Sequence, residues 1–224
     1  MISVIMPVYH EEAIIEKYLA NFPYQDNLEV LVIDGGSQDR TVALAQKFPV
    51  KVELSPEKGR ARQMNFGASQ AQGNILLFLH LDCQLPPNFI TEIEQILQDP
   101  QTIAGAFRFQ VDAPRSSFRW LEKLVNWRSQ FLGLPYGDQG LFIYREKFQV
   151  IGGFQNLPIM EDYELVQRLK KHGKLSIAPS AVITSGRRWQ TLGLWKTTWI
   201  NQMIILGYYL KISPDKLARW YRHF

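Results

Sequence analysis

The sequence predicts an α/β fold, with a mostly parallel central sheet, helices on both faces of that sheet and a mixed second half. Through the first hundred residues, short aliphatic runs alternate regularly with helical patterns. Strands and helices that alternate in this way are the signature of parallel strands joined by crossover helices. The strand-like runs are also nearly continuous in apolar residues, which is typical of strands covered on both faces.

Each expected element has its own local pattern. In the first half, the patterns predict strands at residues 3–8, 28–34, 50–54 and 75–80, and helices at residues 11–22, 39–48 and 60–71. After Pro100 the regular alternation stops. In the second half, the patterns predict strands at residues 103–111 and 139–145, and helices at residues 117–131 and 161–173. The helix at 117–131 carries an apolar stripe that core packing explains, formed by Phe118, Leu121, Leu124 and Val125.

Length and composition set limits on the class of protein. A chain of 224 residues that is 46% apolar suffices for one large domain. We divide it into a core of residues 1–190 and a helical, aromatic and basic tail of residues 191–224 packed on the same domain. The net charge of +4 is spread along the chain and no nucleic-acid-binding module is recognisable, so we expect no nucleic-acid partner. The single cysteine, Cys83, excludes an internal disulfide and a cysteine-based zinc cluster.

The sequence carries no recognisable targeting signal. Met1 leads directly into a strand-like run without a basic segment or a cleavage site, and the longest apolar stretch, residues 203–210, is far shorter than the roughly 20 residues of a spanning helix. We therefore expect a cytoplasmic protein. The tail repeats Trp195, Trp199 and Met203 at helical spacing beside Lys196. Three alternatives stay open for this stripe: core packing, a homodimer contact, or peripheral contact with the inner face of a membrane.

Polar residues concentrate where the first four expected strands end. In an open parallel sheet, ligands bind outside the carboxyl ends of the strands. The four strand exits carry, in chain order, Tyr9, Glu11, Asp34, Asp39, Arg60, Arg62, His80 and Asp82. One edge of the sheet is therefore expected to collect hydrogen-bond donors, acceptors and aromatic surface.

Two of these exits allow both a binding interpretation and a structural one. Asp34 can accept bonds from a nucleobase N–H or a ribose hydroxyl, but "DGGSQDRT" also has the composition of an ordinary strand-to-helix loop. Arg60 begins the pattern of the helix at 60–71. It can point across the edge of the sheet or remain solvated.

The segment "HLD" at the end of the fourth strand suggests a cation site. His80-x-Asp82 is similar to the Asp-x-Asp arrangement that binds a hard cation and, through it, a diphosphate. Mg²⁺ or Mn²⁺ prefers carboxylate and phosphate oxygens, and one or two protein ligands suffice. In the alternative interpretation, Asp82 caps the helix that starts at Pro86 and Pro87.

Further acidic residues lie in the second half. Glu161 and Asp162 stand at the start of the helix at 161–173, where the helix dipole alone favours a carboxylate by roughly 0.3 to 1 kcal/mol. Asp138 lies in "PYGDQG", which either reaches a sugar or an acceptor or forms a turn made flexible by Gly137 and Gly140.

Taken together, six ordered segments resemble the family 2 glycosyltransferases of GT-A fold, which are inverting enzymes that use nucleotide-diphosphate sugars. The segments are "SVIMPVYHEE", "VLVIDGGSQDRT", "KGRARQMNFGA", "ILLFLHLD", "GLFIYREKFQVIGGF" and "MEDYEL", and the resemblance covers residues 1 to about 190. It implies a GT-A-like sheet, a nucleotide-diphosphate sugar donor, a divalent cation (Mg²⁺ or Mn²⁺) and an unknown hydroxyl acceptor, with a lipid-linked acceptor among the alternatives.

The resemblance also implies residue roles. The residues implied to bind the nucleotide are Pro7, Tyr9, Glu11, Asp34, Arg60, His80 and Asp82. Asp82 would bind the metal and Asp162 would act as the general base, with Glu161 shaping the site. Gly186 to Trp189 resembles a basic motif near the diphosphate or acceptor, formed here by Arg187, Arg188 and Trp189. His80 replaces the first aspartate of the family pattern, so that position brings no negative charge.

Two other functions stay open at this point. A sugar nucleotidyltransferase would share the fold, but it usually carries a glycine-rich loop after the first strand, and "PVYHEE" has no glycine. A non-catalytic nucleotide-sugar-binding protein would tolerate loss of the acidic pair, which this chain retains.

Overall fold

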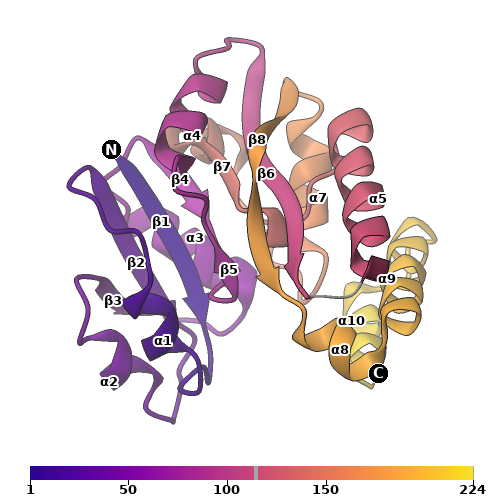
Figure 1. The fold of residues 1–224 in the computed structure, drawn as a ribbon, viewed down its shortest axis with the longest axis horizontal. Helices are drawn as coiled ribbons and strands as arrows, with labels where there is room; N and C mark the ends of the chain where they lie inside the picture. Colours follow the sequence, from indigo (N-terminus) through magenta and orange to yellow (C-terminus); the bar gives the residue numbers. More distant parts are fainter. Residues whose placement is uncertain (114–115, 224) are drawn as a thin grey trace.

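The computed structural model describes residues 1–113 and 116–223, and it describes no side chain for residues 116, 117, 187, 188, 190 and 194. Within this part of the chain, the strands form one eight-stranded sheet in the order β3-β2-β1-β4-β7-β6-β8-β5. Helices cover both faces of the sheet (Figure 1). The predicted α/β class and the mixed second half are therefore confirmed.

The first half is a parallel sheet with short crossover helices. Its strands are β1 (Ile2–Val8), β2 (Leu28–Asp34), β3 (Lys51–Leu54) and β4 (Ile75–Phe78), and its helices are α1 (Ile15–Ala20), α2 (Thr41–Ala45) and α3 (Arg60–Gln70). β1 pairs in parallel with β2 and with β4, and β2 pairs in parallel with β3. The four predicted strands are confirmed, whereas α1 and α2 are shorter than the patterns predicted.

The rest of the chain, from β5 onward, extends the sheet with strands of both directions. The strands are β5 (Cys83–Gln84), β6 (Thr102–Asp112), β7 (Leu141–Tyr144) and β8 (Lys174–Ser185). β7 runs antiparallel to both β4 and β6, whereas β8 runs parallel to β6. The helices are α4 (Phe89–Leu97), α5 (Ser116–Leu132), the 3-10 turn η1 (Gly137–Gln139), α6 (Arg145–Ile151), α7 (Glu161–Leu169), α8 (Arg187–Leu192), α9 (Leu194–Tyr209) and α10 (Pro214–His223).

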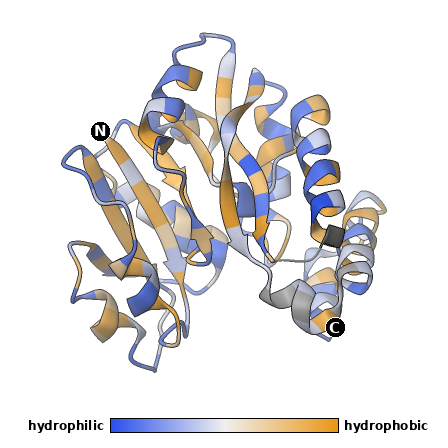
Figure 2. Ribbon diagram, viewed as in Figure 1, coloured by the Kyte–Doolittle hydropathy of each residue, from blue (hydrophilic) through white to orange (hydrophobic). Residues whose placement is uncertain are grey.

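Apolar side chains pack in two layers, one on each face of the sheet. Alternate residues of β1 point to opposite faces, so Val4 and Met6 join the layer beneath α1 and α4, and Ile5 joins the layer beneath α3 and α7. Burying one such side chain stabilises the fold by about 1.5–3 kcal/mol. The strands are predominantly hydrophobic in Figure 2, as the sequence pattern predicted.

A glycine brings α3 close to the sheet. A Cβ at Gly67 would lie 2.6 Å from Cγ2 of Ile5 and 2.9 Å from Cγ1 of Ile33, so no larger residue fits there without a shift. This close packing fixes the position of α3, whose first residue is Arg60. Arg60 is thereby held at the carboxyl edge of the sheet.

The last two helices pack against the start of α7. Ile200 and Ile204 of α9 and Leu217 of α10 form a buried cluster with Met160 and Tyr163. The boundary at residue 190 stays a prediction. None of the described helices is both long enough and apolar enough to span a membrane.

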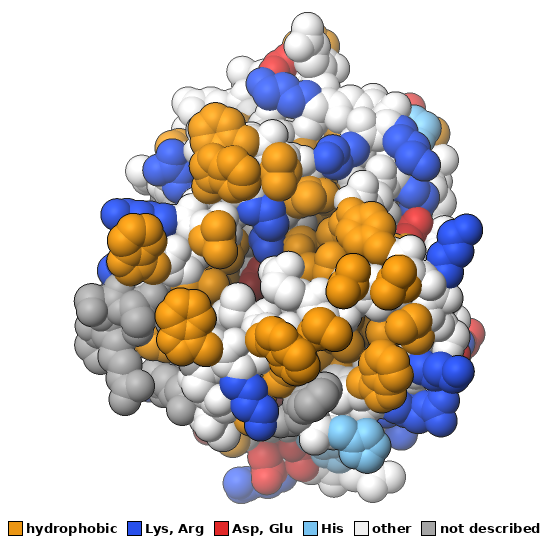
Figure 3. Space-filling view, turned by 90° about the vertical axis from the view of Figure 1, so that its right-hand side faces the viewer, with side chains coloured by type: hydrophobic (Ala, Val, Ile, Leu, Met, Phe, Trp, Pro, Cys, Tyr) orange, Lys and Arg blue, Asp and Glu red, His pale blue; other side chains and the backbone are white. Residues whose placement is uncertain are grey.

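One sequence expectation about α5 is wrong. Phe118 is buried and Leu121 and Val125 pack beside it against β6, but Leu124 is 59% exposed and does not belong to the inward stripe. Leu124 lies instead on an outer face of α5. That side of the molecule carries many exposed hydrophobic side chains interspersed with basic ones (Figure 3).

Candidate active site

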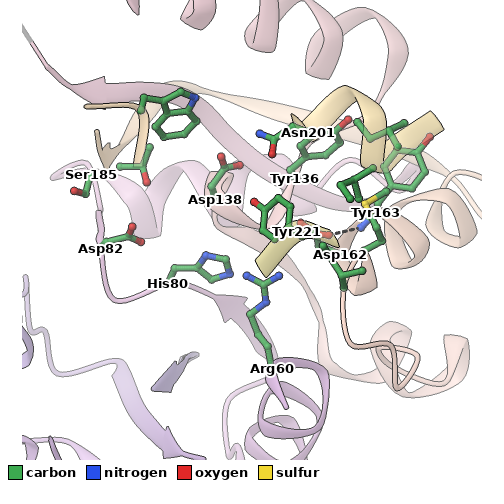
Figure 4. Close-up of a pocket in the computed structure, with 16 residues that line it drawn as sticks. Arg60, His80, Asp82, Tyr136, Asp138, Asp162, Tyr163, Ser185, Asn201 and Tyr221 are labelled. Atoms are coloured by element: carbon green, nitrogen blue, oxygen red, sulfur yellow. Dashed lines mark hydrogen bonds between the residues drawn. The ribbon is translucent and has the colours of Figure 1, made fainter. Parts of the chain in front are cut away.

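A cavity of about 440 Å³ lies beside the carboxyl ends of β4 and β8, between them and the helices α7, α9 and α10. Six residues that were singled out in the sequence line this cavity: Arg60, His80, Asp82, Asp138, Asp162 and Trp189. Figure 4 shows Asp82 and Asp162 on opposite sides of the cavity, with His80 and Arg60 between them. The structure therefore brings together side chains that lie 102 positions apart in the sequence, from Arg60 to Asp162.

A second cavity, of about 240 Å³, adjoins the first. It shares Arg60, His80 and Asp82 with the larger cavity and adds Pro7 and Glu11 from the end of β1 and the loop that follows. Asp82 thus lies where the two cavities meet. Together they offer space on the scale of a small-molecule site, about 300–1,000 Å³.

His80 is an uncharged ring between these cavities. Burial and the neighbouring Arg60 lower the pKa of His80 to about 4, although Asp82 and Asp162 act in the opposite direction. The imidazole is therefore neutral near pH 7. A neutral imidazole can accept a hydrogen bond or ligate a metal, but it contributes no charge.

Arg60 and Glu161 form an ion pair that joins α3 to α7. The Glu161 side chain is 2% exposed and the Arg60 side chain is 45% exposed, so the carboxylate is the anchor and the guanidinium reaches the cavity. Burial raises the pKa of Glu161, and the Arg60 charge counteracts part of that rise. Glu161 is not one of the described residues that line the main cavity. Its place behind Arg60 is consistent with a residue that positions the guanidinium.

Asp162 is held by backbone donors. Its Oδ2 accepts a hydrogen bond from the N–H of Gly137 at 2.8 Å, and its Oδ1 accepts one from the N–H of Tyr163 at 2.7 Å. A Cβ at Gly137 would lie 3.1 Å from that Oδ2 and 3.3 Å from Nε2 of His80, so the glycine permits this close approach.

The chain enters α7 through a left-handed residue. Met160 has φ 66°, a conformation that costs a non-glycine residue about 1–3 kcal/mol and that concentrates at functional sites. This backbone turn sets the direction in which the first residues of α7 leave the loop.

Asp138 and Trp189 present polar atoms without partners. Burial raises the pKa of Asp138 to about 6, although Arg128 acts against that rise. Oδ1 of Asp138 and Nε1 of Trp189 are both buried, and neither has a hydrogen-bond partner among the residues the structure describes. Both residues line the main cavity. Buried polar groups are nearly always paired, so these two atoms suit hydrogen bonds to a bound molecule.

Two of the expected nucleotide-binding residues lie apart from these cavities. Asp34 is 1% exposed, its Oδ2 accepts hydrogen bonds from the N–H groups of Gly36 and Ser37 at 2.8 Å each, and its Oδ1 accepts one from the Ser37 hydroxyl at 2.5 Å. Tyr9 is 48% exposed, with Nζ of Lys58 5.5 Å from its ring centroid. Neither residue lines the two cavities. The side chains of Arg187 and Arg188 lie outside the described residues.

Several cavity residues were not predicted. They come from the loop before η1, from the start of α7, from the end of β8 and from α9 and α10, and they include Tyr136, Tyr163, Ser185, Asn201 and Tyr221. Tyr136 and Tyr163 had a nearby signal, since Tyr136 precedes Asp138 in "PYGDQG" and Tyr163 follows Asp162 in "MEDYEL". The others converge through tertiary packing, which leaves no local pattern.

A buried glutamine holds the turn that carries Asp138. Gln139 is fully buried; its Nε2 donates to the Phe107 carbonyl at 2.9 Å, and its Oε1 accepts from the Ser129 hydroxyl at 2.8 Å. These bonds fix η1 between β6 and α5. The position of Asp138 is therefore set by the core.

The residues around Asp82 fit a cation that is shared with a ligand. Among the described residues, no group of three or more His, Cys, Asp or Glu side chains converges to form an all-protein metal cage. Mg²⁺ and similar hard cations are usually held by one or two carboxylates together with substrate phosphates. A single carboxylate that faces both cavities, as Asp82 does, matches that arrangement.

Known structures share this fold. A mannosyltransferase of Pyrobaculum calidifontis, solved in complex with GDP-mannose and Mn²⁺, superimposes with a TM-score of 0.64 at 22% identity, over 82% of this chain and 56% of that one. S. aureus TarS in complex with UDP superimposes with a TM-score of 0.64 at 19% identity, over 82% of this chain and 60% of that one. Similarity at this level shows the fold alone, and the fold is GT-A-like.

Sequence relatives extend beyond this chain. A dolichol-phosphate mannosyltransferase of Pyrococcus furiosus is 27% identical over 204 residues, which are 84% of this chain and 57% of the relative. An undecaprenyl-phosphate 4-deoxy-4-formamido-L-arabinose transferase of Pseudomonas paraeruginosa is 29% identical over 158 residues, which are 64% of this chain and 46% of the relative. The chain thus spans about half the length of the curated relatives it matches.

The family model described as glycosyl transferase family 2 matches residues 3–152. The match includes Arg60, His80, Asp82 and Asp138 and stops short of Asp162. Because it covers well over half of the chain, it shows the family. This chain belongs to glycosyl transferase family 2.

Proposed function

We propose that this protein transfers a sugar from a nucleotide-diphosphate sugar to an acceptor oxygen, in a single displacement that inverts the anomeric centre. The observation that carries the proposal is that Asp82 and Asp162 line one cavity from opposite sides, with Arg60 and His80 between them (Figure 4). One acidic residue is available for a cation and the other for the acceptor.

The smaller cavity suits the donor nucleotide. Pro7 and Glu11 line one end of it, and Arg60 and Asp82 lie where it meets the main cavity. The guanidinium of Arg60, held by Glu161, offers charged N–H donors to a diphosphate. A divalent cation on Asp82, Mg²⁺ or Mn²⁺, would neutralise the charge that develops on the leaving diphosphate.

The main cavity suits the sugar and the acceptor. In the displacement, an acceptor oxygen forms the bond to the anomeric carbon while the bond from that carbon to the diphosphate oxygen breaks, and its electron pair leaves with the nucleoside diphosphate. Asp162 accepts the proton of an attacking hydroxyl. Oδ1 of Asp138 and the Nε1–H of Trp189 line this cavity, have no hydrogen-bond partner among the described residues, and are available to the bound sugar or acceptor.

The acceptor class we favour is lipid-linked. Ile204, Ile205 and Tyr221 give one wall of the main cavity an apolar character, and two relatives are named for dolichol phosphate and undecaprenyl phosphate. An acceptor phosphate is already ionised near pH 7 and attacks without a base, whereas a hydroxyl needs one. The dependence of turnover on Asp162 therefore distinguishes these two acceptors.

Two alternatives have less support. A sugar nucleotidyltransferase would use a glycine-rich loop after β1, but residues 9–14 of this chain contain no glycine. A nucleotide-sugar-binding protein without activity would not need Asp162 against the cavity, where Gly137 and the turn at Met160 hold it.

The proposal is tested by thermal shift with nucleoside diphosphates and their sugars, each with and without Mn²⁺. A ligand at 100 times its Kd stabilises the folded state by about 2.7 kcal/mol. We expect at least one nucleotide to raise the melting temperature by several degrees only when Mn²⁺ is present. If no nucleoside diphosphate or nucleotide sugar raises it under either condition, the proposal is wrong.

A further inference from the structure

Two helices expose apolar stripes to solvent. On α5 the exposed residues are spaced by four, three and four positions, and on α9 by four, four, three and four. The stripe on α5 is Trp120, Leu124, Trp127 and Phe131, with exposures of 78, 59, 53 and 69%. The stripe on α9 is Trp195, Trp199, Met203 and Leu206, continued by Leu210 directly after the helix, with exposures of 84, 58, 43, 49 and 67%. We call these nine residues the aromatic face.

The aromatic face is not the side through which these helices pack on the protein. α5 contacts β6 through Phe118 and its neighbours, and α9 packs on α7 through Ile200 and Ile204. α9 therefore has apolar residues both on the side that packs against the protein and on the side that faces solvent. A helix with this pattern is normally buried on both sides. Apolar surface of this extent on a water-soluble domain generally marks a binding surface.

The charged side chains around the aromatic face are almost all basic. Residues 116–132 and 187–211 contain a single acidic residue, Glu122, and it is 8% exposed and paired with Arg119. Basic residues lie between the apolar ones; Nζ of Lys123 is 5.6 Å from the Trp120 ring centroid, and Lys196 follows Trp195. Figure 3 looks onto this side and shows blue side chains among the orange ones, with little red.

We propose that the aromatic face docks on the surface of an anionic lipid bilayer, with α5 and α9 lying in its interfacial plane. Tryptophan is enriched at membrane interfaces, and four of the nine residues are tryptophans. Lysine and arginine beside them are attracted to anionic headgroups. A second copy of the chain is a poorer occupant, because a two-fold dimer through this face would oppose two basic surfaces.

Docking would bring the candidate active site to the lipid. Asn201, Ile204 and Ile205 of α9 line the main cavity, so the helix that carries part of the aromatic face also forms one wall of the cavity. Figure 3 shows that this side of the molecule is hollowed near its centre. In this arrangement a lipid-linked acceptor would reach the cavity without leaving the bilayer. This last step rests on the proposed function, whereas docking itself does not.

The test is sedimentation with vesicles of phosphatidylcholine, alone or mixed with phosphatidylglycerol. We expect the protein to bind the mixed vesicles, with a blue shift of tryptophan fluorescence and weaker binding at high salt. The double variants Trp120→Ser/Trp127→Ser and Trp195→Ser/Trp199→Ser should each reduce the partition coefficient by about tenfold or more. Lys123→Gln/Lys196→Gln should weaken binding to the mixed vesicles only. Val150→Ser is the matched control: Val150 is 81% exposed on α6, and its substitution should change nothing.

Docking would be overturned if the wild type did not bind anionic vesicles, or if the tryptophan variants bound them as well as the wild type does. It would also be overturned if the wild type did not bind vesicles but formed a dimer in sedimentation velocity that both tryptophan variants abolish. Thermal melting with and without nucleotide and Mn²⁺ is measured on every variant. A variant that keeps its nucleotide-dependent shift is folded. If the wild type shows the nucleotide-dependent shift but does not bind anionic vesicles, only this inference is overturned. If the wild type binds the vesicles but shows no nucleotide-dependent shift, only the proposed function is overturned.

Discussion

Asp34 and Asp138, two aspartates at the same edge of the sheet, use their oxygens in opposite ways. Asp34 directs both oxygens at its own loop, where they accept hydrogen bonds from Gly36 and Ser37. Asp138 leaves Oδ1 buried and without a partner among the described residues, and burial raises its pKa to about 6. A carboxylate that is satisfied by its own loop stabilises the fold, whereas an unsatisfied one is destabilising and is available to a ligand.

The largest effect we expect from a substitution on the acceptor side is at Asp162. Asp162→Asn keeps the volume and an acceptor for the Gly137 N–H, but it removes the base, so transfer to a hydroxyl should slow by about 10²- to 10⁴-fold. The measurement is the initial rate of transfer, with thermal melting as the control for folding. Near-normal turnover in a folded variant would exclude the base role and favour an acceptor phosphate.

The contrast between the two aspartates predicts opposite effects on stability. Asp34→Asn removes part of a set of three hydrogen bonds and should lower the free energy of unfolding by about 1–3 kcal/mol. Asp138→Asn replaces a buried carboxylate whose Oδ1 has no partner among the described residues, and it should leave the free energy of unfolding unchanged or higher. Urea unfolding at pH 7, without nucleotide or cation, measures both. Equal destabilisation by the two substitutions would contradict the comparison.

The same contrast depends on pH. Because burial raises the pKa of Asp138 to about 6 in the folded state, above its ordinary value, the folded protein holds that proton more tightly than the unfolded chain does. The stability that this proton contributes is fully present below about pH 4 and is lost as the pH rises through about 6. The free energy of unfolding of Asp138→Asn, minus that of the wild type, should therefore increase by about 1–3 kcal/mol between pH 4 and pH 7. A difference that does not change across this range would show that Asp138 is not perturbed by its burial.

The smallest effect is expected at Trp189. Its ring packs against Phe109 at a centroid distance of 5.8 Å, and Trp189→Phe keeps an aromatic ring while removing the unpaired Nε1–H. Loss of one hydrogen bond to a ligand should raise the acceptor KM by roughly threefold to tenfold, with little change in kcat or melting temperature. An unchanged KM would remove Trp189 from the acceptor site.

The sequence predicted the first half of the fold better than the second, for a physical reason. β1, β2 and β4 are covered on both faces, so each is a nearly continuous apolar run that is visible locally. β8 was missed because Ser176, Pro179 and Ser180 interrupt its apolar pattern, and because its partner β6 lies about 70 residues earlier in the chain. Leu124 was misplaced because α5 is apolar on two faces, and spacing alone does not show which of them is buried.

In the candidate site, too, some residues were predictable from the sequence and others were not. Asp82 and Asp162 were predictable because each stands at the end of a strand or the start of a helix within a recognisable segment. Asp34 has a similar sequence context, and the structure adds that its oxygens accept hydrogen bonds from its own loop; its role in nucleotide binding stays a prediction. Asn201 and Tyr221 could not be predicted, since they reach the cavity only when α9 and α10 pack on α7.

The central claim is that Asp82 and Asp162 face one cavity with separable roles. The most direct test is isothermal titration calorimetry of the best nucleoside diphosphate from the thermal-shift panel, with Mn²⁺, on the wild type, Asp82→Asn and Asp162→Asn. We expect Asp82→Asn to lose the Mn²⁺-dependent part of the affinity and Asp162→Asn to keep it. Wild-type affinity and wild-type Mn²⁺ dependence in Asp82→Asn would contradict the account.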